Sequence, residues 1–281
     1  MISLSSLTPL ACILTLLNKI PQWLLMYAYF MIIIAWYVAG LKKMLNEFFD
    51  CIFVINLESR SDRRSEMEGE LNKIGLSFTD GSAEILLASR FTDSAGFDTP
   101  GTRGCFDSHL RALKTAYDRN SKGVLIFEDD CDFVHDIKNR LPSVMRHLSN
   151  TQWSFFYGGH LSAITTDFDA RGISKIAANQ SLLGAHFLAV SSAVLPMLIE
   201  YLEAMRAREP GSHLGGPMHV DGAYSWFRKE KPDLETWVAE PQLGFQRPSR
   251  TDIHHLKFYD RVAGLRQLVA AVRRLKRKFR K

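Results

Sequence analysis

The stretch VLIFEDD, from Val124 to Asp130, joins four apolar residues directly to three carboxylates. A short apolar run bounded by Gly123 and by charges predicts a buried strand. Three adjacent carboxylates repel one another and are costly to bury without a cation. Because open α/β sheets bind ligands at the carboxyl ends of their strands, this stretch predicts an α/β fold with an acidic ligand site at a strand end.

The acidic run suits a hard divalent cation. Mg²⁺ and Mn²⁺ take oxygen ligands, and such a cation would neutralise the carboxylates and stabilise charge on a departing nucleoside diphosphate. We predict Glu128 and Asp130 as the metal ligands, because they have acid-x-acid spacing and Glu128 directly ends the strand. Asp130 and Asp132 share that spacing, so the register stays open at this point. A solvated acidic loop is the alternative.

Strand-like and helix-like patterns alternate on both sides of the acidic run. The first unit is a strand over 51–57, a turn, and a helix that Ser59 or Ser61 caps and Gly75 ends. Residues 76–104 predict a weak strand and then a polar loop. The remaining predicted elements are helices over 105–120 and 192–205, strands over 124–127, 153–159 and 183–190, and an ordered loop over 241–252.

An apolar segment precedes these elements. Trp23 to Leu41 is nineteen residues without a charge, and as a helix it would reach about 28 Å, nearly the hydrocarbon core of a bilayer. Lys42 and Lys43 follow, so we predict a membrane anchor over 1–43, with the next domain on the cytoplasmic face. The alternatives are a cleaved signal peptide and, because Met44 directly precedes the first predicted strand, a mispredicted extension.

Residues 259–281 form a predicted basic tail. From Arg261 to Lys281 there are nine Lys or Arg and no Asp or Glu. Apolar residues recur there at helical spacing, which predicts an amphipathic helix that can lie on an anionic leaflet. A helix packed on the domain and a nucleic-acid-binding run are the alternatives. The apolar stripe favours the membrane, and we predict no nucleic-acid partner.

The composition fits one large domain between these two ends. The chain has 281 residues, of which 46% are hydrophobic, enough to form a core. We assign residues 44–258 to a single catalytic domain. The four cysteines, Cys12, Cys51, Cys105 and Cys131, include no Cys-x-x-Cys pair and predict no disulfide framework. We interpret them as small apolar residues in a reducing compartment.

Six sequence blocks occur in the order typical of one known family. They are FVINLESRSDRR (53–64), GTRGCFDSHLRAL (101–113), VLIFEDDCDF (124–133), GAHFLAVSSAV (184–194), PMHVDGAY (217–224) and PQLGFQRPSRTDI (241–253). On these blocks the chain resembles glycosyltransferase family 25, which includes bacterial lipopolysaccharide glycosyltransferases and collagen galactosyltransferases.

The resemblance implies a fold, an activity and a cofactor. The fold is a single nucleotide-sugar transferase domain, GT-A-like, with a mixed, mainly parallel sheet. The activity is transfer of galactose or a similar sugar from a UDP-sugar to a glycan or lipid-linked glycan acceptor, usually with inversion at the sugar carbon. The cofactor is a divalent metal, Mn²⁺ or Mg²⁺. Lipopolysaccharide or other cell-surface glycan synthesis is the expected setting.

Several residues are predicted to bind the donor, together with Glu128 and Asp129. Asn56 is predicted to contact the nucleotide, and Arg60 and Arg64 to meet its phosphates, with a solvated first turn of a helix as the alternative. Ser108 lies near a predicted helix N-terminus, where a phosphate or a sugar hydroxyl binds readily. A simple helix cap accounts for Ser108 equally well.

Asp221 is the predicted general base. An inverting transfer needs a carboxylate to take the proton of the acceptor hydroxyl, and the late motif of the family places Asp221 in that role. The family often carries a second acid where this chain has Gly222, and a turn aspartate is the alternative. Ser108 and His109 are not predicted as a nucleophile and base, because adjacent helical side chains point in different directions.

Two other functions remain open from the sequence. A metal-dependent phosphotransferase or hydrolase would use the same acids. A membrane-bound, non-enzymatic protein with a decayed transferase fold is the second alternative, although the intact acidic run argues against decay.

Overall fold

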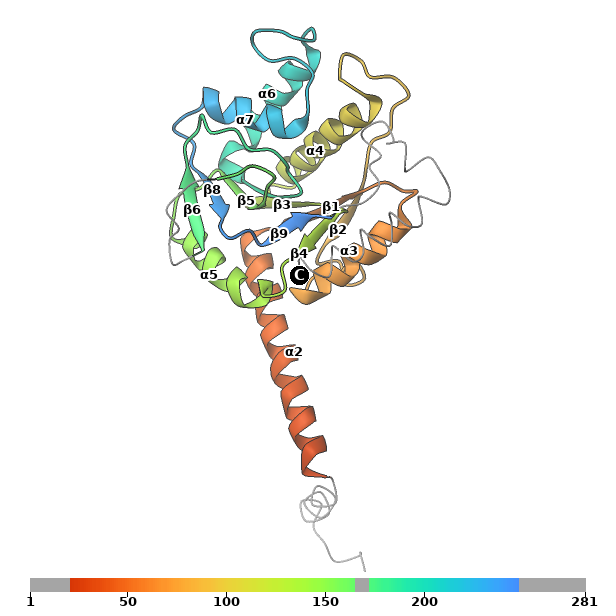
Figure 1. Cartoon of the computed structure of the whole chain (residues 1–281), viewed down its shortest axis with the longest axis vertical. Coiled ribbons are helices and arrows are strands. Elements are labelled where there is room, and N and C mark those ends of the chain that lie inside the picture. Colours follow the sequence, from red (N-terminus) through yellow and green to blue (C-terminus); the bar gives the residue numbers. More distant parts are fainter. Residues whose placement is uncertain (1–20, 165–171, 248–281) are drawn as a thin grey trace, which may run out of the picture.

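A computed structural model describes residues 21–164 and 172–247 of the chain. A seven-stranded sheet lies between two layers of helices (Figure 1). The predicted tail over 259–281 and the first twenty residues of the predicted anchor lie outside the described residues. In sheet order the strands are β2 (Glu84–Leu87), β1 (Cys51–Asn56), β3 (Gly123–Glu128), β7 (Phe187–Ser191), β5 (Phe155–Gly159), β8 (Thr236–Ala239) and β6 (Ile173–Ile176).

The sheet is mixed and mainly parallel, as predicted. β1 pairs in parallel with both β2 and β3, and β5 pairs in parallel with β8. β7 runs antiparallel to β3 and β5, and β6 runs antiparallel to β8. Five strands therefore share one direction and two oppose it. The carboxyl ends of β1 and β3 lie at the same edge, because Ile55 is in register with Glu128.

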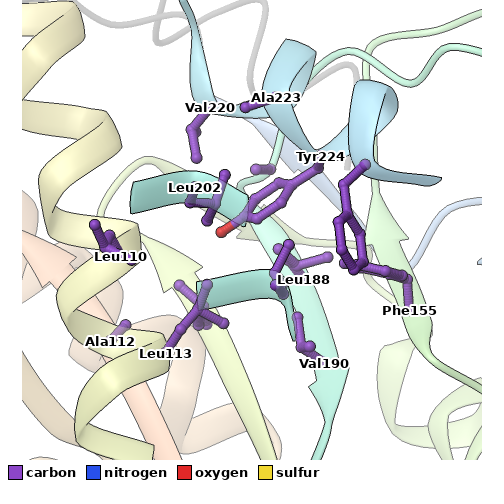
Figure 2. Close-up of a cluster of buried hydrophobic side chains, with 14 of the residues drawn as sticks. Leu110, Ala112, Leu113, Phe155, Leu188, Val190, Leu202, Val220, Ala223 and Tyr224 are labelled. Atoms are coloured by element: carbon purple, nitrogen blue, oxygen red, sulfur yellow. The ribbon is translucent and has the colours of Figure 1, made fainter. Parts of the chain in front are cut away.

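Alternating side chains on the strands form two hydrophobic cores. Phe53 and Ile126 belong to the core under one layer of helices, whereas Val54 and Phe127 belong to the core under the other. The first layer consists of α4 (Pro100–Asp118), α6 (Leu195–Ala207) and α7 (Val220–Glu230), with the short 3₁₀ helix η2 (Ser192–Val194) leading into α6. The second contains α3 (Ser61–Lys73), α5 (Ile137–Ser149) and the end of α2 (Gln22–Phe48). Figure 2 shows the first core, with Tyr224 of α7 packed near Leu188 and Leu202.

Helix α2 is continuous from the apolar segment into the domain. Its first part extends away from the sheet (Figure 1), and large side chains such as Trp23 and Trp36 are 69% and 84% exposed. Leu41 and Leu45 in its last turns are buried, and Leu45 belongs to the second core. By length and composition α2 is able to cross a membrane. One helix thus joins the apolar segment to the sheet without an intervening linker.

Several local predictions are wrong. The strand predicted over 183–190 begins only at Phe187. The helix predicted over 105–120 begins at Pro100, because the side chain of Thr99 caps it by accepting from the amide of Thr102 at 3.0 Å. Neither predicted serine caps α3, whose N-cap residue is Arg60 without a side-chain cap. The predicted loop over 241–252 contains strand β9 (Gly244–Gln246), which pairs antiparallel with β4 (Cys131–Phe133).

Candidate functional site

Strand β3 directs the adjacent carboxylates of the acidic run to opposite faces of the sheet. Glu128 continues the alternation of Ile126 and turns toward α4. Its Oε1 lies 3.2 Å from Nε2 of His109, and the other ring nitrogen of His109 lies 3.2 Å from the hydroxyl of Tyr224. Figure 2 shows this hydroxyl pointing from α7 into the space beside α4. His109 is therefore fixed on both sides, and through it Glu128 is tied to the core.

Asp129 turns the other way, toward α3. Nη1 of Arg63 donates to its Oδ1 at 2.6 Å, and Nδ2 of Asn56 donates to its Oδ2 at 2.8 Å. Arg63, Asn56 and Asp129 are all buried. Both carboxylate oxygens of Asp129 are thus engaged inside the protein, where they hold the end of β1 against the end of β3.

The three arginines after β1 have different partners. Arg63 contacts the acidic run, although sequence reasoning selected Arg60 and Arg64 for the donor. Arg60 makes a bidentate ion pair with Asp62, at 2.8 and 2.9 Å, and this guanidinium lowers the pKa of Asp62 to about 2. The guanidinium of Arg64 donates to the amide oxygen of Asn56, at 3.1 and 3.2 Å. Arg64 therefore meets a neutral partner, which leaves its charge available to an anion.

Asp130 lies between the two faces. Its Oδ2 is 3.4 Å from Nη1 of Arg63, and Nε2 of Gln246 approaches both of its carboxylate oxygens at 3.5 Å. Burial, reinforced by the charge of Glu128, raises the pKa of Asp130 to about 7. Burial also favours a higher pKa for Glu128, but the His109 hydrogen bond and nearby positive charge outweigh it and lower the pKa of Glu128. A proton and a cation therefore compete for Asp130 at neutral pH.

Asp132 forms a buried ion pair with Arg247. Its Oδ1 accepts from Nε and Nη2 of Arg247, at 2.9 and 2.7 Å, and Asp132 is fully buried. Arg247 also pairs with Glu66 of α3. The β4–β9 pairing brings Arg247 to this position, next to the acidic run. This arrangement favours Glu128 and Asp130 as the acid-x-acid pair, since their side chains are 19% and 12% exposed.

Ser108 does not lie at a helix N-terminus, because α4 begins at Pro100. Its side chain is fully buried, and its hydroxyl donates to the carbonyl of Gly104 at 2.6 Å while accepting from the amide of Ser89 at 2.9 Å. Ser108 therefore joins the segment after β2 to the middle of α4. Any role in donor binding remains a prediction.

Asp221 lies in the first turn of α7. Its Oδ2 accepts from the amide of Gly184 at 2.8 Å, and its Oδ1 accepts from the amide of Gly222 at 2.7 Å. The charge of Asp221 also affects the thiol of Cys105. Burial raises the pKa of that thiol well above its usual value, and the negative charges of Glu128, Asp221 and Asp130 raise it further. Asp221 is therefore on the Glu128 side of the sheet.

The carboxylates of the acidic run are ligands of the type that a divalent cation would need. Glu128 and Asp130 present carboxylate oxygens of the kind that Mn²⁺ and Mg²⁺ prefer. The side chain of Glu128 is 19% exposed and Asp130 is buried, and a cation would offset the charge of Glu128, which adds to burial in raising the pKa of Asp130. The sequence does not predict that Arg63 binds Asp129, that Tyr224 contacts the histidine beside Glu128, or that Arg247 binds Asp132.

The fold and the site define an α/β protein with an acidic cluster at the end of an interior strand of its sheet. Residues 93–181 match the sequence profile described as glycosyltransferase family 25 (LPS biosynthesis protein). Procollagen galactosyltransferase 2 of the mouse (Mus musculus) is 34% identical over 129 residues, which are 40% of this chain and 21% of that protein. The resemblance to family 25 is confirmed, and the chain is homologous to its glycosyltransferases.

Two further proteins are similar over more of the chain. The mouse protein named inactive glycosyltransferase 25 family member 3 is 28% identical over 233 residues, which are 72% of this chain and 38% of that protein. A solved glycosyltransferase involved in the glycosylation of the major capsid of PBCV-1 is 9% identical, with a TM-score of 0.36, and covers 72% of this chain and 94% of its own. The chain spans about a fifth to two fifths of the length of the curated relatives it matches.

Proposed function

We propose that this protein transfers a sugar, galactose or a similar hexose, from a UDP-sugar to a glycan or lipid-linked glycan acceptor. The observation that carries the proposal is the division of the acidic run at the end of β3. Arg63 and Asn56 bind both carboxylate oxygens of Asp129 at 2.6 and 2.8 Å. Asp130 is also buried, but its contacts with Arg63 and Gln246 are longer, at 3.4 and 3.5 Å, and the side chain of Glu128 is 19% exposed. This division leaves two carboxylates for a cation and fixes the turn that carries them.

In this proposal Glu128 and Asp130 hold Mn²⁺ or Mg²⁺, which supplies positive charge next to the departing nucleoside diphosphate. Arg64, whose guanidinium meets only the neutral amide of Asn56 in the hydrogen bonds described above, contacts a donor phosphate. Arg60 lies at the same turn, but its charge is already paired with Asp62, so its role would be secondary to that of Arg64. Asn56 acts indirectly, because it positions Arg64 and Asp129.

Asp221 is the proposed general base. Its carboxylate takes the proton from the acceptor hydroxyl as that oxygen attacks the anomeric carbon and the bond to the diphosphate breaks, which inverts the configuration at that carbon. The amides of Gly184 and Gly222 hold the carboxylate in place.

A donor screen of the full chain in detergent tests the proposal. We expect UDP and one or more UDP-sugars to raise the unfolding temperature only when Mn²⁺ or Mg²⁺ is present, and UDP to be released when acceptor is added. Ligand at 100 times its Kd stabilises a protein by about 2.7 kcal/mol, which corresponds to roughly 5–11 °C for a domain of this size. Protection by no nucleotide sugar under any of these conditions would contradict the transferase proposal.

A catalytically inactive family member is the second candidate. It is favoured by the inactive relative, which aligns with 72% of this chain whereas the procollagen galactosyltransferase aligns with 40%. The same screen separates the candidates, because an inactive member would show binding without release of UDP to any acceptor. A phosphotransferase or hydrolase would instead act on the donor without forming a glycoside.

We also propose that α2 anchors the protein in a membrane, with the domain on the cytoplasmic side and the acceptor in the same bilayer. The first part of α2 carries exposed apolar side chains, and the last part of the same helix is buried in the domain. Tyr37 donates to the carbonyl of Lys138 at 2.8 Å, and Lys42 pairs with Asp80 at 2.7 Å. The domain is therefore held directly at the proposed membrane surface.

The double substitution Ile32→Lys and Ile33→Lys should release the protein from membranes. Each lysine near the centre of a membrane helix costs about 2.5–3.5 kcal/mol. We expect the variant to leave the membrane pellet after alkaline extraction, whereas the matched Ile32→Leu, Ile33→Leu protein stays. Intact mass and protease protection in sealed vesicles complete the measurement. A mature chain lacking this segment, or a double lysine variant that still pellets, would argue against the anchor.

A further inference from the structure

Three donor atoms of different chemistry converge beside the proposed cation pair. Sγ of Cys105, Nε2 of His109 and Oε1 of Glu128 belong to a group whose ligand atoms all lie within 4.8 Å of one another. Cys105 and His109 are four residues apart on α4 and so lie on one face of the helix. Glu128 reaches them from the end of β3. Two rigid elements therefore present all three groups.

The distances fit a tetrahedral ion. With bonds of about 2.3 Å to sulfur and about 2.0–2.1 Å to nitrogen and oxygen, a tetrahedral zinc ion separates its nitrogen and oxygen ligands by about 3.3 Å and its sulfur and oxygen ligands by about 3.5 Å. The corresponding separations here are 3.2 Å between His109 and Glu128 and 4.0 Å between Cys105 and Glu128. The third pair, the thiol and His109, lies within 4.8 Å, so a movement of the thiol toward the other two groups would complete three of four positions.

The histidine is already oriented for a metal. Metal-bound histidines usually donate their other ring N–H to a fixed acceptor, which sets the tautomer. Here the hydroxyl of Tyr224 lies 3.2 Å from Nδ1 of His109, so it can accept a hydrogen bond from Nδ1–H in the tautomer that a metal at Nε2 requires, in which Nε2 no longer donates to Glu128. Tyr224 is itself fully buried in the core that Figure 2 shows. The contact between Tyr224 and His109 is thus held in place by the packed core.

We propose that Cys105, His109 and Glu128 form an inhibitory zinc site that competes with the Mn²⁺ or Mg²⁺ site for Glu128. A thiolate and an imidazole suit Zn²⁺, whereas the carboxylates of Glu128 and Asp130 suit the harder cations. Binding forms a sulfur–zinc bond, releases the thiol proton to solvent and leaves one position for water. The competition rests on the proposed function, because it needs Glu128 to serve the other cation; zinc binding itself does not.

Cobalt tests the site without any sugar transfer. We expect Co²⁺ added to the full chain in detergent to give thiolate-to-cobalt charge-transfer absorption and the visible bands of a tetrahedral ion, and Zn²⁺ to abolish them. Cys105→Ser should remove the charge-transfer band, whereas Cys51→Ala, a buried cysteine on β1 away from the group, should keep it. Tyr224→Phe should weaken Zn²⁺ binding by about 10- to 100-fold.

The second readout is Mn²⁺-dependent protection by UDP. Zn²⁺ should suppress this protection in the unmodified protein and should lose that effect in Cys105→Ser. The absence of a thiolate band, or a band that survives Cys105→Ser, overturns the zinc site. A normal cobalt spectrum without any UDP protection overturns the proposed function but leaves the zinc site standing. UDP protection that Zn²⁺ leaves unchanged, despite a normal cobalt spectrum, overturns the competition.

Discussion

Glu128→Gln and Asp130→Asn should each lower kcat/KM for sugar transfer by about 10³-fold or more. A metal ion supplies several kcal/mol of charge stabilisation in the transition state, and each 1.36 kcal/mol changes the rate about tenfold. Both substitutions preserve side-chain shape and remove one negative charge. In Glu128→Gln the amide oxygen would still accept from His109, so the fold of this edge should persist. Steady-state kinetics with the donor found by the screen, together with a Mn²⁺ titration, measures the effect.

The matched control is Glu203→Gln. Glu203 lies on α6, is 41% exposed and pairs with Lys114, so the same chemical change there should leave kcat/KM and Mn²⁺ affinity unaltered. If Glu128→Gln and Asp130→Asn both retained transfer and Mn²⁺ affinity within a few-fold, the cation pair would be wrong. A loss confined to one of them would assign the cation to that carboxylate alone.

The pH dependence of stability gives Asp130→Asn a readout that is independent of activity. The pKa of Asp130 rises from 3.8 to about 7 in the folded protein. Between these values the folded state binds more protons than the unfolded state, so the contribution of Asp130 to stability falls as pH rises. Without added cation, Asp130→Asn should therefore flatten the decline in unfolding free energy between about pH 4 and 7, and Mn²⁺ should offset the decline in the unmodified protein.

The sequence was sufficient for the strands that carry the site. The apolar runs of β1 and β3 are contiguous and bounded by polar residues, so local pattern alone locates them. The acids after β3 could be assigned to a strand end for the same reason. Their division between two faces follows from the two-residue period of a strand, and that period is enough by itself to separate Glu128 from Asp129.

The positions of the arginines around helix α3 were not enough to predict which of them turns toward the acidic run. Met67 and Leu71 define the buried face of α3, and both Arg63 and Arg64 lie within one turn of that face. Only the position of Asp129 decides that Arg63 turns inward. The start of α4 was a different error. The signal, Thr99 followed by Pro100, was present, but Gly101 and Gly104 weaken the helical pattern that follows it.

Partners distant in sequence could not be predicted. Tyr224 is 115 residues from His109, and Arg247 is 115 residues from Asp132. Strand β9 has three residues, too few for an apolar pattern to show, yet it positions Gln246 and Arg247. These contacts depend on the sheet order and on the late chain returning to β4, which no local pattern encodes.

Arg247→Met should lower the free energy of unfolding by about 3–5 kcal/mol, the usual cost of leaving one member of a buried ion pair without its partner. Asp132 is fully buried and accepts two hydrogen bonds from Arg247. The substitution therefore leaves the negative charge of Asp132 buried without a cationic partner. For a domain of this size the loss corresponds to roughly 6–20 °C in the unfolding temperature. Thermal and urea unfolding of the full chain in detergent measure it.

Two further variants identify the cause. Adding Asp132→Leu to Arg247→Met should recover most of the loss, because the unpaired charge is gone and Glu66 can be hydrated at its 43% exposed side chain. Asp62→Asn breaks the bidentate pair with Arg60, in which Asp62 is 63% exposed, and should cost less than about 1 kcal/mol. Equal losses in the single and double variants would show that packing, rather than charge, accounts for the effect.

The same variants decide the register of the acidic run. If Asp132 were a metal ligand, Asp132→Asn would abolish Mn²⁺ binding and change stability little, as expected for Asp130→Asn. Because Arg247 occupies Asp132 inside the β4–β9 ladder, we expect the reverse: a large loss of stability, with Mn²⁺ still bound to Glu128 and Asp130 in whatever fraction stays folded. The two acid-x-acid pairs share Asp130, and they differ in the third carboxylate: Glu128 is partly exposed, whereas Asp132 is fully buried against Arg247.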